Sequence, residues 1–170
     1  VLYYDIIDKL SIGNAKKCKS LNELLKNSDI VSLHVDGKKS NTNLISDKEF
    51  SIMKEKSILV NYSRGNVVDI DSLIKNIKNK KLMGAALDVF PQEPSNNKEK
   101  FKSKVKGIEE IILSPHIGGS TKEAQKNIGS YVPDKIIDFI NSGNTSSSVN
   151  FPKLSLPCLL YTSDAADDLL

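Results

Sequence analysis

The chain has 170 residues, enough to bury one hydrophobic core of ordinary size. A hydrophobic share of 39%, a charged share of 26% and a net charge of +3 are those of a soluble globular protein, and they argue against binding to nucleic acid or a membrane surface. Two cysteines, without a CxxC or Cys/His cluster, predict neither a disulfide framework nor a metal site. No apolar run approaches the roughly 20 residues that span a bilayer.

Short apolar runs alternate with amphipathic stretches along the chain. Strands are expected at 1–5, 30–35, 57–62, 82–90 and 111–113. Helices are expected at 21–25, at 46–53, after Asp69 as an N-cap, and after Ser120, which would form a capping box with Glu123. Strands that alternate with helices indicate βαβ units and a parallel sheet. We therefore predict an α/β fold: part of a Rossmann-type parallel sheet with flanking helices.

Three segments depart from this alternation. Residues 91–107 are polar and irregular, and residues 143–148 have the composition of a linker or turn. The last segment, 158–170, breaks the pattern of everything before it. We predict that this tail is foreign sequence and leave it out of the fold.

Polar residues follow the predicted strands, where ligands bind in a parallel sheet. They are Asp5, His34, Tyr62–Ser63–Arg64, Asp88 and Pro115–His116, and we expect them to gather on one edge. In a dinucleotide-binding fold, an acid in the place of Asp5 accepts hydrogen bonds from the adenosine ribose, although a simple turn former is the commoner explanation. The Gly-x-Gly-x-x-Gly loop that should precede it by about 20 residues is absent from the sequence.

Arg64 is the single arginine among 24 lysine and arginine residues. Lysine supplies a plain positive charge elsewhere, so a guanidinium here favours a task that needs a planar fork, such as binding a carboxylate through two hydrogen bonds. Gly65 lets the backbone turn after the strand. The alternative for Arg64 is a surface ion pair of little energetic value.

Glu93 and His116 are the candidates for acid–base chemistry. Pro91 and Pro94 stiffen the loop around Glu93, and a carboxylate on such a loop can orient a histidine. An imidazole such as His116 can give a proton to a carbonyl oxygen and take it back in reverse. Each has a simpler alternative as a solvent-facing loop residue, and for His34 we favour that alternative or a place in the cofactor wall.

Three motifs together resemble the D-isomer-specific 2-hydroxyacid dehydrogenase family. They are Asn-Tyr-Ser-Arg-Gly at 61–65, Asp-Val-Phe-Pro-Gln-Glu-Pro at 88–94 and Ser-Pro-His-Ile-Gly-Gly-Ser-Thr at 114–121. The resemblance implies catalytic Arg64, Glu93 and His116, and NAD as cofactor. The cofactor-binding residues it implies are Asp5, Tyr62, Ser63, Arg64, Asp88, His116, Ile117, Gly118 and Gly119.

The runs at 118–125 and 148–152 are similar to those of family members that oxidise 3-phosphoglycerate to 3-phosphohydroxypyruvate in serine biosynthesis. The resemblance implies a partial NAD-binding domain at 1–129 and a crossover segment at 130–157, which returns toward a substrate domain missing from the chain. It also implies a small-molecule substrate, a cytoplasmic location and a homo-oligomer. The chain departs from the family in the bulky Tyr62, in Asp36 where proline is usual, and in Pro133, which predicts a kink in the last helix.

Other functions fit the same residues. The three catalytic candidates do not determine which 2-hydroxy acid is the substrate, so a hydroxypyruvate or glyoxylate reductase is an alternative. A protein that binds NAD and recognises a partner without catalysis is an alternative of another class. A third expectation is that the chain alone, without a pyrophosphate loop, is inactive and binds NAD weakly.

Overall fold

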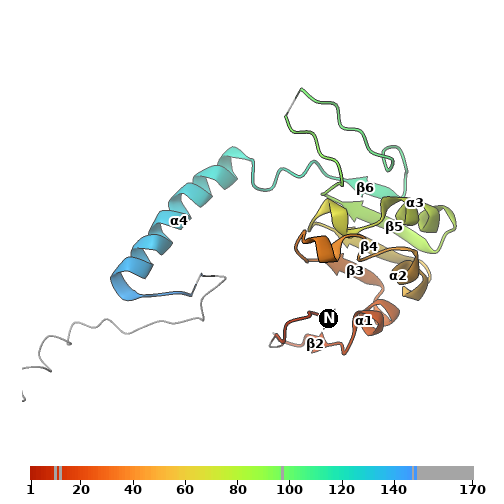
Figure 1. The fold of residues 1–170 in the computed structure, drawn as a ribbon, viewed down its shortest axis with the longest axis horizontal. Helices are drawn as coiled ribbons and strands as arrows, with labels where there is room; N and C mark the ends of the chain where they lie inside the picture. The colour runs from red at the N-terminus through yellow and green to blue at the C-terminus, as the bar shows by residue number, and fades with distance from the viewer. Residues whose placement is uncertain (10, 12, 97, 147, 149–170) are drawn as a thin grey trace, which may run out of the picture. The chain divides into compact units, whose positions relative to one another are not determined.

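The computed structural model describes residues 1–148 except 10, 12, 97 and 147. The chain divides into two compact units, Val1–His116 and Ile117–Leu170. In the first unit a four-stranded parallel sheet has the order β3-β4-β5-β6, with strands Ile30–Leu33, Ser57–Asn61, Leu82–Leu87 and Ile111–Leu113 (Figure 1). A separate parallel pair consists of β1 (Leu2–Tyr3) and β2 (Lys16–Lys17). The predicted α/β fold with a parallel sheet is confirmed, whereas β2 had not been predicted.

Three helices connect these strands, and polar N-caps explain where each begins. Helix α1 (Leu21–Asn27) is capped by Ser20. Helix α3 (Ile70–Lys78) is capped by Asp69, and this second cap had been predicted. Helix α2 (Asp47–Ile52) begins with a capping box of Ser46 and Glu49. Two short 3₁₀ turns lie at Lys39–Asn41 and Gly65–Val67.

The hydrophobic core lies between one face of the four-stranded sheet and helices α1, α2 and α3 (Figure 1). Successive strand residues point to opposite faces, so Val31 and Leu33 are buried while Ile30 is exposed. Leu25, Phe50 and Leu73 supply the helical side of this core, each fully buried. This packing fixes the strands, and therefore the loops that leave their carboxyl ends.

The second unit contains helix α4, Lys122–Ser142. Its N-cap is Thr121, whose hydroxyl accepts the Ala124 N–H at 3.1 Å, so the predicted capping box of Ser120 and Glu123 is wrong. Ser120 instead closes a turn by donating its N–H to the Ile117 carbonyl. The helix continues through Pro133, and the kink there stays a prediction.

Two further expectations stay predictions. The boundary between a cofactor domain at 1–129 and a crossover segment at 130–157 is one of them. The foreign tail at 158–170, the other, lies outside the described residues. Among the residues that are described, no helix is long and apolar enough to cross a membrane.

Candidate active site

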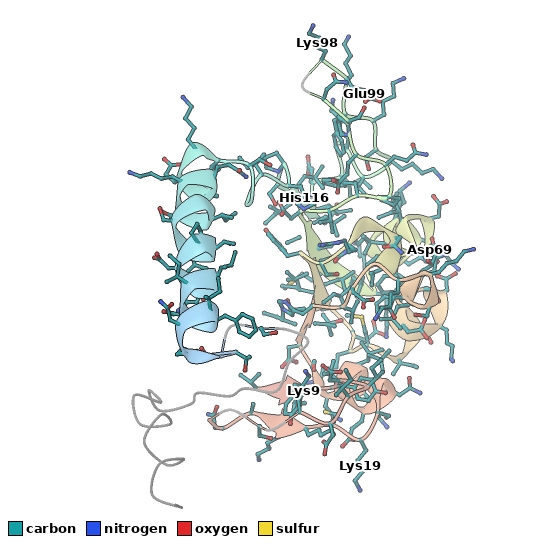
Figure 2. All side chains as sticks on the ribbon, turned by 60° about the vertical axis from the view of Figure 1, so that its left-hand side comes forward. Lys9, Lys19, Asp69, Lys98, Glu99 and His116 are labelled. Atoms are coloured by element: carbon teal, nitrogen blue, oxygen red, sulfur yellow. The ribbon has the colours of Figure 1, made fainter. Side chains whose placement is uncertain are left out.

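The carboxyl ends of β4, β5 and β6 meet at one edge of the sheet, because neighbouring strands run parallel. Arg64 follows β4, Asp88 follows β5, and His116, which is labelled in Figure 2, follows β6. Asp5 does not share this edge through strand pairing. Its strand, β1, pairs with β2 and not with the four-stranded sheet, which corrects the expectation that all these polar residues gather on one edge. The Asp5 carboxylate accepts the N–H of Ile7 in a local turn.

Glu93 and His116 are in direct contact, although 22 residues separate them in the sequence. The ring atom Nδ1 of His116 lies 2.8 Å from Oε2 of Glu93. The other carboxylate oxygen of Glu93 accepts the backbone N–H of Phe90 at 2.9 Å, which fixes Glu93 close to the end of β5. Both side chains are partly exposed, 42% for His116 and 35% for Glu93. Hydrogen bonds therefore orient the pair, which is still accessible to a small molecule.

Arg64 is placed by a buried asparagine at the end of β4. The Asn61 side chain accepts the N–H and hydroxyl of Ser63 and donates to the Arg64 carbonyl at 3.0 Å. The Arg64 guanidinium donates to the Ser63 carbonyl at 2.6 Å, and its aliphatic part covers Gly37. No hydrogen bond or ion pair within the described part of the chain joins Arg64 to Glu93 or His116.

Gly65 brings the Arg64 segment against the segment that carries Glu93. A Cβ atom at Gly65 would lie 2.0 Å from the backbone carbon and oxygen of Phe90. Only glycine permits two backbones to approach so closely. The loops that follow β4 and β5 are thus packed together at this edge.

Asp88 contacts the histidine loop with one carboxylate oxygen. Its Oδ1 accepts the Ser114 hydroxyl at 2.6 Å and the backbone N–H of His116 at 3.0 Å. The hydroxyl of Tyr62 lies 3.5 Å from that of Ser114, and Tyr62 is half-exposed. Tyr62 therefore borders the same edge of the sheet.

The remaining predicted cofactor residues lie in different environments. Ser63 is buried, and both its N–H and hydroxyl are already donated to Asn61. Ile117, Gly118 and Gly119 belong to the second unit, where the Gly119 carbonyl accepts the Gln125 amide. The binding roles of all these residues stay predictions. His34, at the end of β3, pairs its ring with the Ser32 hydroxyl at 2.9 Å.

Residues 1–118 match the family model described as D-isomer specific 2-hydroxyacid dehydrogenase, NAD binding domain. The chain belongs to this family. NAD is accordingly the cofactor of the domain. The chain is also 50% identical to D-3-phosphoglycerate dehydrogenase of Haemophilus influenzae over 92% of its own length, and it spans 38% of that relative.

Solved structures of the family agree with the fold. The structure of D-2-hydroxyisocaproate dehydrogenase matches 85% of this chain with a TM-score of 0.71 and 30% identity, over 47% of that protein. The D-lactate dehydrogenase of Lactobacillus jensenii, solved with NAD⁺, matches 82% of the chain with a TM-score of 0.68 and 29% identity, over 44% of that protein. The chain thus spans less than half of the dehydrogenases to which it is similar.

Three residues that organise the site were not among the predicted site residues: Asn61, Gly37 and Ser114. Asn61 offers a signal in the sequence, because an amide that ends an apolar strand becomes a buried polar group in need of partners. Ser114 opens the motif at 114–121, but its hydrogen bond to Asp88 and the contact of Gly37 with Arg64 depend on what lies opposite them in space.

Proposed function

We propose that the full-length protein carrying this chain oxidises D-3-phosphoglycerate to 3-phosphohydroxypyruvate with NAD, in serine biosynthesis. The 50% identity to a phosphoglycerate dehydrogenase supports this substrate. The observation that carries the reaction type is the Glu93–His116 pair, 2.8 Å apart at the carboxyl edge of a sheet of the NAD-binding family.

The residues at this edge fit the nicotinamide end of NAD. Exposed Tyr62, half-buried Asp88 and exposed His116 offer polar groups just after β4, β5 and β6. The Gly-rich loop that holds a pyrophosphate is not in this sequence, so the fit concerns one end of the cofactor only. Tyr62, Asp88 and His116 would hold this end of NAD, which would supply the acceptor for the hydride that leaves C2 of the hydroxy acid.

His116 acts as the general base in this proposal. Because Glu93 engages Nδ1, the other ring nitrogen, Nε2, is left to take the proton of the substrate hydroxyl as the carbonyl forms. Protonation makes the ring positive, and the adjacent carboxylate of Glu93 stabilises that charge. In the reverse direction the same nitrogen returns the proton to the carbonyl oxygen.

Arg64 would hold the carboxylate of the substrate. Arg64 is an exposed residue, and the backbone carbonyl of Ser63 accepts a hydrogen bond from one of its guanidinium nitrogens. The remaining N–H groups can form two parallel hydrogen bonds to a carboxylate and place the C2 oxygen near His116. A lysine could not form this planar fork.

The partner of this site is a small 2-hydroxy acid. We also propose a cytoplasmic homo-oligomer, as the naming of the relatives as metabolic dehydrogenases suggests. A substrate panel on the full-length protein separates 3-phosphoglycerate from lactate, hydroxypyruvate and glyoxylate, because the catalytic residues alone do not distinguish them.

The decisive test is His116→Ala in the full-length protein, with His34→Ala as the matched control. The chain has only these two histidines, and His34 pairs with Ser32 away from Glu93. We expect His116→Ala to lower kcat by about 10² to 10⁴-fold, while the Kd for NAD changes by less than about threefold. His34→Ala should keep wild-type kcat. Turnover of the His116→Ala variant at the wild-type rate would overturn the proposal.

A further inference from the structure

The backbone of His116 has an unusual conformation. Its φ is +51°, in the left-handed region that residues other than glycine rarely adopt. Among the residues that the structure describes, the other non-glycine residues with positive φ are Asn43, Lys56 and Lys80, and all three lie in turns that connect regular elements. His116 instead carries a side chain at the candidate site, so its conformation needs another cause.

That cause is in the side chain of Asp88. The pairing of β5 with β6 extends to Ser114, whose N–H donates to the Leu87 carbonyl. Pro115 has no N–H, so the next backbone donor is that of His116. Asp88 Oδ1 accepts this N–H at 3.0 Å together with the Ser114 hydroxyl at 2.6 Å. One oxygen therefore closes the turn Ser114–Pro115–His116 from both sides.

Asp88 is itself held in place by contacts other than these two bonds. It follows β5 directly, its N–H donates to the Asn61 carbonyl of β4 at 3.1 Å, and it is half-buried. A strained backbone persists when its surroundings determine it from several directions. Asp88 fixes the main chain of His116, and Glu93 fixes its ring.

We infer that Asp88 is a positioning residue, which acts through the Ser114 hydroxyl and the His116 amide to hold the imidazole of His116 in place. This inference deepens the proposed dehydrogenase function and rests on it for its effect on turnover. The inference concerns Oδ1 of Asp88, the oxygen that accepts both bonds.

Ser114→Ala is the sharpest variant, because it removes one of the two bonds while leaving Asp88 and the ring of His116 intact. In the full-length protein, assayed with NAD and its best 2-hydroxy acid, we expect kcat to fall on the order of 10-fold while KM for NAD stays within about twofold. Ser114→Thr keeps the hydroxyl and should restore most of kcat. If Asp88 served only as a cofactor ligand, Ser114→Ala would cause no loss of kcat.

A second measurement does not depend on activity. With isotope-labelled histidine, amide hydrogen exchange of His116 can be followed by NMR in the wild type, Ser114→Ala and Asp88→Ala, with the His34 amide as internal control. We expect exchange at His116 to be about 10-fold faster in Asp88→Ala, and faster in Ser114→Ala, with His34 unchanged.

The two readouts separate the possible failures. If the wild type oxidises no 2-hydroxy acid, the proposed function fails, and the exchange rates alone decide whether Asp88 fixes the His116 backbone. Unchanged exchange at His116 in Asp88→Ala overturns the inference. So does a wild-type kcat in Ser114→Ala when the wild type is active.

Discussion

Glu93 holds Nδ1 of His116 at 2.8 Å with one carboxylate oxygen, while its other oxygen accepts the N–H of Phe90. Glu93 is thus bound both to the segment that follows β5 and to the histidine that follows β6. Replacing this carboxylate by a neutral amide removes the charge that stabilises a protonated ring and disturbs its orientation.

Glu93→Gln should therefore lower kcat of the full-length protein by roughly 10 to 100-fold, with KM for NAD within about threefold. Steady-state kinetics measure both values. Glu99→Gln is the matched control, because Glu99 lies in the same loop but accepts its hydrogen bonds from Ser95. Equal kcat values for the two variants would show that the carboxylate of Glu93 does not assist His116.

Gly65→Ala should destabilise the protein severely, because the added Cβ meets the backbone of Phe90 at 2.0 Å and backbone atoms cannot rotate away. We expect a loss of about 3 kcal/mol or more in the free energy of unfolding, measured by urea denaturation followed by circular dichroism. Gly118→Ala serves as control, since a Cβ at Gly118 has no atom within 4 Å. A wild-type unfolding midpoint for Gly65→Ala would contradict the packing of the two loops.

Gly37→Ala tests the placement of Arg64 separately from its charge. A Cβ at Gly37 would lie 3.1 Å from Cγ of Arg64, a flexible side chain that can move aside. We expect the fold to survive and KM for the hydroxy acid to rise by about 3 to 10-fold, with KM for NAD unchanged. Gly129→Ala on α4, where a Cβ has no close neighbour, should change neither constant. An unaltered KM for the hydroxy acid in Gly37→Ala would show that the placement of Arg64 does not affect substrate binding.

Asp47 makes the stability of the first unit depend on pH. It opens α2 and accepts hydrogen bonds from Lys75 at 2.7 Å and Asn76 at 2.9 Å, both on α3. The bond from the Lys75 ammonium, helped by the Asn76 amide, lowers the pKa of the Asp47 carboxyl. Since the folded pKa lies below the unfolded value, about 3.9, the bridge stabilises the fold above that pH and is lost as the pH falls through the folded pKa.

Asp47→Asn should therefore melt at a lower temperature than the wild type at about pH 7, and the difference should shrink as the pH falls below about 4. Thermal melts at a series of pH values measure this. Lys75→Met removes the same bridge from the other side and should converge with the wild type over the same range. A melting difference that persists unchanged at the acid end would mean that Asp47 acts through something other than its charge.

The sequence predicted the parts of the fold that depend on local pattern. Asp69 as a helix cap and the apolar runs of β3 to β6 need only neighbours along the chain, and they are confirmed. Ser120 was chosen as a cap because a glutamate follows three residues later. The neighbouring Thr121 caps the helix instead, since the Ser120 N–H is used in the turn from Ile117. Such one-residue competition cannot be decided from composition.

The candidate site divides in the same way. The motifs identified Glu93 and His116, and their contact is present. The support around them could not be predicted, because the approach of Gly65 to Phe90 and the bonds from Asp88 to the histidine loop join segments that follow different strands. The expectation that Asp5 follows a strand of the same sheet failed for the same reason, since a sequence gives the order of strands along the chain but not the partner of each one.

Glu93 lies at the base of the long loop between β5 and β6, whereas Lys98 and Glu99 stand at its outer end (Figure 2). Because Glu93 is anchored to Phe90, three residues away, we expect an insertion at Lys98 and Glu99 to leave the carboxylate in place. This outer end is thus a natural place for a fluorophore or an affinity handle. Insertions at this outer end during evolution would likewise leave the Glu93–His116 pair in place.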